Sequence, residues 1–337
     1  MDYLSNSYFL HLISKLPHRI ILYRVSSAVL SLIPTPFQPS LPPKMPTDFT
    51  LPTATFTTSD GATLSYIHHS TSPTHPHLVL LPGWSQSAAL FSAQLSHFSL
   101  THTVTALDHR SHGASPPVPH GARISRLAAD LHELLLHLEI KDVTLLGHSM
   151  GCSVIWSYID LFGQSALKAL ILVDEPACLT ADPTLPAPAL LAAKKAGALL
   201  TPDGSYQLAA GLRGEKPEET LVPFMRGIFS PGIEEERFRY AVQQARRTDA
   251  GFAARLLVDH VNEDWRDVVG RIEVPTLVVG GEGSLVGRGA VEDLVGRVKG
   301  GKLRVFGVEE KGSHFMFWEN PEVINAVVEE FLDDVEG

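Results

Sequence analysis

The sequence predicts an α/β fold in which a mostly parallel sheet is flanked by helices and interrupted by a helical insertion. Short apolar, β-branched runs alternate with stretches of helical period, and many of the runs end in small or polar residues. Between residues 177 and 271 this alternation stops, and helical stretches follow one another without strand signals. The 337 residues are enough for one large domain that carries such an insertion.

Eight segments are predicted as strands. Asp60-Gly61 separates the first two and is a hairpin-type turn signal. The continuous apolar character of later runs, such as residues 169–173, is typical of strands that are buried on both faces. The predicted strands are residues 49–58, 63–69, 78–81, 103–107, 143–146, 167–174, 274–280 and 302–306.

Stretches of helical period occupy the chain between and after these strands. Ile124, Leu127, Leu131 and Leu134 recur at the spacing of an amphipathic helix that covers a sheet. The predicted helices are residues 88–97, 124–138, 152–161, 187–200, 218–229, 234–247, 251–269 and 321–335. The predicted organisation is a core at 49–176 and 272–337 with a helical insertion at 177–271.

The first 48 residues are predicted to be a leader and linker. Up to Pro46 they carry one acidic residue, Asp2, against four basic residues, and Pro17 interrupts any single helix. Such a composition is compatible with a transit peptide or with an interfacial membrane anchor through residues 1–33. A leader that packs on the surface or stays mobile is the alternative. We expect a cytoplasmic protein, with a mitochondrial or membrane-associated location as the alternative.

Composition excludes several classes of partner. The formal net charge of −10 argues against nucleic acid as a partner.

Cys152 and Cys178 do not make a disulfide framework, and Cys152 is interpreted as a small buried residue. The histidines, including His109 and His112, lack the spacing of a metal site, and the loop around these two is interpreted as structural, held by Asp108 and Arg110. We predict no metal and no cofactor.

The motif Gly147-His148-Ser149-Met150-Gly151 directly follows a predicted buried strand and precedes a predicted helix. It matches the G-x-S-x-G nucleophile elbow, a sharp turn from strand to helix. Glycines are needed beside the serine because side chains would collide there. Ser149 is therefore the candidate nucleophile.

A serine nucleophile needs a base within hydrogen-bond reach. His314 lies in Gly312-Ser313-His314, after the last predicted strand and before the last helix. The pKa of histidine lies near neutral pH, which suits a general base.

Together these motifs resemble the α/β-hydrolase superfamily over roughly residues 50–337. The Leu-Pro82-Gly83-Trp84 loop and the Asp108-x-Arg-x-His-Gly-x-Ser loop also carry the resemblance. The resemblance implies that Ser149 is the nucleophile and that His314 is the base and then the acid. It also implies an oxyanion hole made by the backbone N–H groups of Trp84 and Met150. The insertion stands where a lid over the active site is expected.

The triad acid departs from the commonest pattern. Many relatives carry it after the seventh strand, where this chain has Glu282 and, near the expected aspartate, Ser284. Other members place the acid at the end of the preceding core strand, where Asp174 stands, followed by Glu175. We predict Asp174, with Glu282 and then Glu175 as alternatives, because a strand end holds the acid rigidly against the imidazole.

The expected activity is that of a serine hydrolase that cleaves an ester, lactone or related acyl bond of a small apolar substrate through an acyl-enzyme. Phe224, Phe229 and Phe315 are candidate substrate-binding residues. The alternatives are a cofactor-independent ring-cleaving dioxygenase, a haloperoxidase-like enzyme, or a non-catalytic receptor that keeps the pocket.

Overall fold

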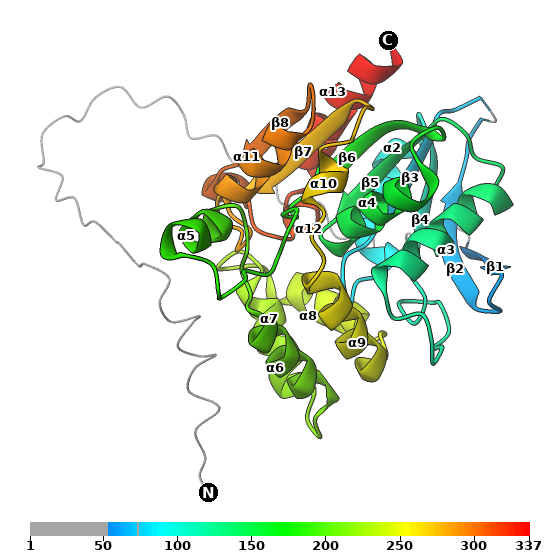
Figure 1. Cartoon of the computed structure of the whole chain (residues 1–337). Coiled ribbons are helices and arrows are strands. Elements are labelled where there is room, and N and C mark those ends of the chain that lie inside the picture. Colours follow the sequence, from blue (N-terminus) through cyan, green and yellow to red (C-terminus); the bar gives the residue numbers. More distant parts are fainter. Residues whose placement is uncertain (1–52, 73) are drawn as a thin grey trace, which may run out of the picture. The chain divides into compact units, whose positions relative to one another are not determined.

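The protein forms an eight-stranded sheet in strand order β1-β2-β4-β3-β5-β6-β7-β8 (Figure 1). The computed structural model describes residues 53–72 and 74–337; the predicted leader, and with it any membrane association through residues 1–33, lies outside this range. β1 and β2 form the predicted hairpin, β2 pairs antiparallel with β4, and all later pairings are parallel. The prediction of a mostly parallel eight-stranded sheet is confirmed. The strands are β1 (Thr53–Thr57), β2 (Thr63–His69), β3 (His77–Leu81), β4 (Thr103–Leu107), β5 (Val143–His148), β6 (Leu167–Val173), β7 (Thr276–Gly281) and β8 (Lys302–Phe306).

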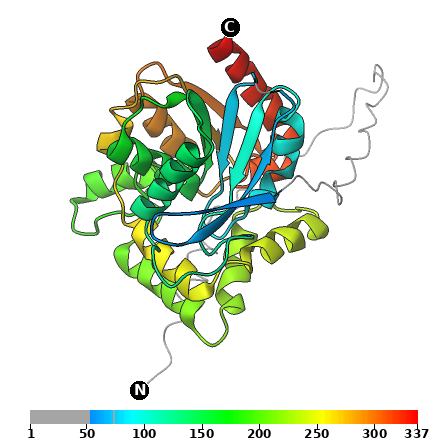
Figure 2. The same ribbon diagram turned by 90° about the vertical axis from the view of Figure 1, so that its right-hand side faces the viewer.

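Helices cover both faces of the sheet (Figure 2). α3 packs on α4 over one face, and α2 packs on α13 over the other. The central strands β4, β5 and β7 are buried along their whole length, which explains their continuous apolar sequences. These core helices are η1 (Ala88–Phe91), α2 (Ser92–Phe98), α3 (Ile124–His137), α4 (Met150–Phe162), α10 (Arg266–Val269), α11 (Arg288–Arg297), η2 (Val308–Glu310), α12 (Met316–Glu319) and α13 (Pro321–Glu336).

Five helices lie between β6 and α10, in the segment predicted as an insertion. Two predictions of helix boundaries here are wrong. The helix predicted at 187–200 ends early because Gly197 adopts a positive φ, and a separate helix then begins at Pro202, capped by Thr201. The helix predicted at 251–269 is divided between α9 and α10. The five are α5 (Ala187–Lys195), α6 (Pro202–Arg213), α7 (Glu218–Gly227), α8 (Glu235–Ala245) and α9 (Ala250–Val261).

The loop after β4 is held by buried charges, as predicted. Asp108 accepts the backbone N–H groups of Ala88 (2.7 Å) and Ala114 (2.8 Å). The guanidinium of Arg110 is fully buried and donates to Asp130 at 2.6 and 2.7 Å. Among the residues that the structure describes, no group of three or more His, Cys, Asp or Glu side chains could hold a metal ion.

No helix in the described ranges is both long and apolar enough to cross a membrane. Cys152 is free and buried in α4, which confirms its interpretation as a small buried residue; Cys178 is also free.

Candidate active site

Ser149 stands in a strained turn between β5 and α4. Its backbone has φ 53° and ψ −127°, a conformation that L-residues rarely adopt, and α4 begins at the next residue. A Cβ atom at Gly151 would lie 2.2 Å from the carbonyl oxygen of Leu81, and one at Gly147 would lie 2.7 Å from the backbone nitrogen of Cys152. The turn therefore requires both glycines of the motif.

His314 and Asp174 are brought together from two different loops. Asp174 follows β6 with a positive φ of 55°, and its backbone N–H donates to Val279 of β7 at 2.8 Å. His314 lies on the loop between η2 and α12. The Nδ1 atom of His314 lies 2.7 Å from Oδ2 of Asp174, and both side chains are buried. This hydrogen bond leaves Nε2, the other ring nitrogen, free to exchange a proton.

The two alternative carboxylates lie elsewhere. Glu282 is about half exposed and pairs with Arg288 at 3.1 Å. Glu175 is buried and lines the same cavity as Ser149, but its carboxyl lies beside His260, 3.4 Å from Nε2, rather than beside His314. The Ser284 hydroxyl, near the position where many relatives carry the acid, donates to Oδ2 of Asp174 at 2.5 Å.

His148, one of the two variable residues of the elbow motif, holds the backbone of His314 in place. Its Nε2 atom donates to the backbone carbonyl of His314 at 2.7 Å, which fixes the proton on Nε2. The side chain of Gln86 packs beside the other ring nitrogen, with Oε1 3.0 Å from Nδ1. The same Gln86 oxygen accepts the backbone N–H of Gly83 at 3.0 Å. Burial and the nearby His314 hold the pKa of His148 well below its usual range, so the ring is neutral. Sequence reasoning missed this support, although the histidine beside the serine was visible.

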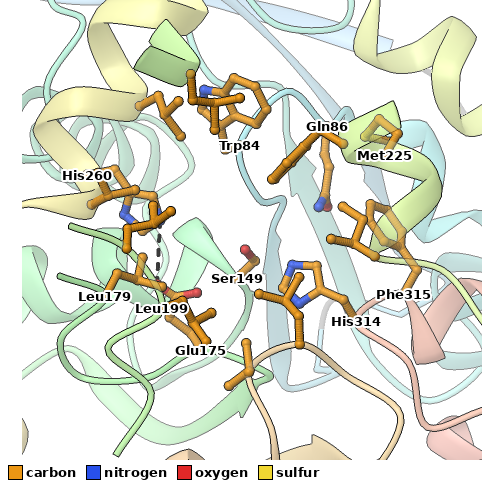
Figure 3. A pocket seen from close by; sticks show the side chains of 18 residues that line it. Trp84, Gln86, Ser149, Glu175, Leu179, Leu199, Met225, His260, His314 and Phe315 are labelled. Carbon is orange, nitrogen blue, oxygen red and sulfur yellow. Dashed lines mark ion pairs between the residues drawn. The ribbon is translucent and has the colours of Figure 1, made fainter. Parts of the chain in front are cut away.

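A cavity of about 110 Å³ opens over these residues (Figure 3). Ser149, Glu175, His260 and His314 contribute polar atoms to it. The remaining wall is mostly apolar and includes Trp84, Leu179, Leu208, Met225, Leu257 and Val286.

Two of the three predicted substrate-binding phenylalanines line this cavity. Phe224 and Phe315 lie on its wall. Phe229 does not; its ring stacks on that of Phe315 with centroids 4.3 Å apart and supports it from behind. Phe224 also packs edge-on against Trp84, with ring centroids 5.7 Å apart.

Trp84 joins the core to the helices between β6 and β7. Its indole Nε1 donates to the backbone carbonyl of Ala253 in α9 at 2.9 Å. Within the described part of the chain, neither the backbone N–H of Trp84 nor that of Met150 donates to a protein acceptor. Both amides therefore remain available to a ligand.

Residues 76–321 match the model of a family described as the alpha/beta hydrolase fold. A Synechocystis protein named "Putative non-heme chloroperoxidase" is 24% identical over 84% of this chain and all of its own length. The structure is similar to an esterase from Exiguobacterium antarcticum (TM-score 0.73, 22% identity), over 84% of this chain and 99% of the esterase. It is also similar to the enol-lactonase from Burkholderia xenovorans (TM-score 0.71, 19% identity), over 83% of this chain and all of the lactonase. Because the family model spans well over half of the sequence, and the sheet has the expected strands, the chain belongs to the alpha/beta hydrolase fold family.

Proposed function

We propose that the protein is a serine hydrolase that cleaves an ester or lactone of a small apolar substrate through an acyl-enzyme. The hydrogen bond between His314 and Asp174 carries this proposal, because it joins a base to an orienting acid at the cavity that Ser149 also lines. The esterase and lactonase among similar structures support the choice of an acyl bond.

In the proposed mechanism Oγ of Ser149 attacks the substrate carbonyl carbon while Nε2 of His314 accepts the hydroxyl proton. Asp174 holds the Nδ1–H tautomer and stabilises the imidazolium that forms. The free backbone N–H groups of Trp84 and Met150 stabilise the negative oxygen of the tetrahedral intermediate. His314 then protonates the leaving alcohol, and water, activated by the same imidazole, releases the acid from Ser149.

We propose that the helices between β6 and β7 act as a lid over this site. Leu208 of α6, Met225 of α7 and Leu257 of α9 supply cavity wall, so these helices separate the reacting atoms from solvent. This assignment preserves the predicted division into core residues 49–176 and 272–337 with a lid at 177–271.

Labelling with a fluorophosphonate probe tests the nucleophile. The wild-type protein should be labelled, and Ser149→Ala should not be. Ser153→Ala is a matched control, because Ser153 is a buried serine one turn along α4 and should not affect labelling. A folded wild-type protein that resists the probe, and that hydrolyses no member of a panel of p-nitrophenyl esters and lactones, would contradict the proposal.

Perhydrolysis is a second candidate, favoured by the full-length similarity to the named chloroperoxidase. Hydrogen peroxide would replace water in attacking the acyl-enzyme, giving a peracid and free Ser149. The peracid would then oxidise bromide, which bromination of monochlorodimedone detects. This activity should require an added carboxylic acid or ester and should be lost in Ser149→Ala. Substrate-dependent oxygen uptake that survives Ser149→Ala but not His314→Ala would instead indicate a dioxygenase.

A further inference from the structure

Glu175 and His260 face the cavity beside Ser149 and have no part in the mechanism proposed above. Glu175 follows Asp174 at the end of β6, and His260 belongs to α9. Figure 3 shows the pair on one side of Ser149 and His314 on the other. Two ionisable side chains therefore line a cavity whose other walls are mostly apolar.

The pair is buried but incompletely hydrogen-bonded. Glu175 is 2% exposed and His260 is 4% exposed. Nε2 of His260 lies 3.4 Å from Oε1 of Glu175, which is longer than a normal hydrogen bond. Within the described residues, Oε1 of Glu175 and Nδ1 of His260 have no hydrogen-bond partner. Because a buried polar group without a hydrogen-bond partner is destabilising, a ligand that supplies the missing partner gains affinity.

Burial favours the uncharged form of both groups. Burial and the neighbouring Asp174 raise the pKa of the Glu175 carboxyl well above its usual range, and hydrogen bonding to Ser149 offsets this only in part. Burial and the nearby His314 lower the pKa of His260 to about 3. A protonated carboxyl donates a hydrogen bond, and a neutral imidazole can donate one and accept another. Such a pair of side chains suits a hydrogen bond to an uncharged oxygen atom of a ligand better than contact with a charged group.

We propose that Glu175 and His260 form an oxygen-binding subsite that selects hydroxy- or oxo-substituted acyl groups over plain hydrocarbon acyl groups. This inference rests on the proposed hydrolase function and specifies its substrate as a mostly apolar acyl group that carries one uncharged oxygen. The backbone N–H of Ser149 donates to Val173 at 2.9 Å, so Glu175 stands one strand away from the nucleophile. Neighbouring strands lie about 4.8 Å apart, so Glu175 and Ser149 reach the same cavity from adjacent strand ends.

The test compares p-nitrophenyl 3-hydroxybutanoate with p-nitrophenyl butanoate. We expect wild-type kcat/KM to be higher for the hydroxy ester. In Glu175→Leu the ratio of the two kcat/KM values should fall about 10- to 100-fold, the equivalent of one lost hydrogen bond in a buried site. Glu175→Gln keeps a donor and an acceptor and should retain the ratio to within about threefold. His260→Phe should lower the ratio in the same direction as Glu175→Leu.

Glu282→Leu is the matched control, because Glu282 is an exposed glutamate that pairs with Arg288 and does not line the cavity. It should leave the ratio unchanged. Circular dichroism and thermal unfolding verify that each variant is folded. A Glu175→Leu ratio equal to that of the wild type would overturn the subsite. A Glu175→Gln ratio as low as that of Glu175→Leu would overturn the neutral hydrogen-bonding role.

A binding measurement separates this inference from the hydrolase proposal, because it needs no turnover. Ethyl 3-hydroxybutanoate should bind Ser149→Ala about tenfold more tightly than ethyl butanoate, measured by isothermal titration calorimetry. The double variant Ser149→Ala/Glu175→Leu should lose this difference. Equal affinities in Ser149→Ala would contradict the subsite even if the enzyme hydrolyses esters, and a preserved difference would support it even if no ester is cleaved.

Discussion

Nδ1 of His314 lies 2.7 Å from Oδ2 of Asp174, a residue 140 positions earlier in the chain. The hydroxyl of Ser284 donates to the same carboxylate oxygen at 2.5 Å. Ser284 lies near the position where many relatives carry an aspartate. In this protein its hydroxyl instead holds the carboxylate of Asp174, which comes from the end of the neighbouring strand β6. This is possible because β6 and β7 are paired, so that the loops at their carboxyl ends adjoin.

Replacing Asp174 by Asn should lower kcat about 10²- to 10⁴-fold, because the amide no longer fixes the productive tautomer or stabilises the imidazolium. Hydrolysis of p-nitrophenyl butanoate measures this effect. Glu282→Gln serves as the control and should stay within about twofold of the wild type. If Glu282→Gln shows the large loss and Asp174→Asn does not, the acid is assigned to the wrong strand.

Moving the acid to position 284 should restore part of the lost activity. In Asp174→Asn/Ser284→Asp the new carboxylate stands at position 284. The wild-type serine at this position already contacts the Asp174 carboxylate, so an aspartate there lies close to the same place. We expect kcat at least tenfold above that of Asp174→Asn alone. Asp174→Asn/Ser284→Asn has the same shape without the charge and should give no gain, so equal activity of the two double variants would refute the rescue.

The cavity predicts a preference for short acyl chains. An apolar cavity of about 150 Å³ holds a benzene-sized group, and the cavity here is about 110 Å³. We therefore expect kcat/KM for p-nitrophenyl butanoate to exceed that for the octanoate by about tenfold or more. Phe224→Ala removes part of the wall and should reduce this difference, whereas Phe162→Ala, on the exposed end of α4, should not. Equal rates for both esters in the wild type would contradict the prediction.

Stability should fall on acidification because neutral histidines are buried around the site. Burial lowers the pKa of His112 to about 4, while its Nδ1 donates to the Arg110 carbonyl at 2.9 Å and its Nε2 accepts the Ser85 N–H at 3.3 Å. The unfolded chain protonates this histidine below about pH 6.5, whereas the folded protein keeps it neutral. Its contribution to the free energy of unfolding is therefore fully present above about pH 6.5. That contribution decreases as pH falls toward 4, by about 1.4 kcal/mol per pH unit for this group.

Urea denaturation at pH 7 and pH 5 measures the slope. His112→Gln should be less sensitive to pH than the wild type, because glutamine keeps polar contacts but does not titrate. An unchanged slope in this variant would show that His112 does not contribute to acid sensitivity.

Several features of this protein could be read from the sequence because they depend on neighbouring residues. Alternation of apolar runs with helical periods located the eight strands along the chain, and Asp60-Gly61 marked the hairpin between β1 and β2. The elbow was visible because a strained turn needs glycines at fixed spacing from Ser149. His314 was predicted as the base from its place between the last strand and the last helix, and it stays a prediction.

The helices that were missed show where local reasoning failed. α6 and α11 each contain two or more glycines, which lower helix propensity, yet both form because buried apolar side chains such as Leu208 and Leu294 pack against the rest of the protein. Tertiary packing outweighs a propensity difference of about 1 kcal/mol per glycine.

Only the tertiary structure decided which carboxylate meets His314 and what surrounds Ser149. The sequence offered Asp174, Glu175 and Glu282 as candidate acids, and their environments depend on how the strand ends come together. The same holds for the contact between Glu175 and His260, because the residues that surround each of them in the sequence do not predict the other as its neighbour. Contacts between segments far apart in the chain arise from the packing of whole elements, so their partners become known only once those elements are placed.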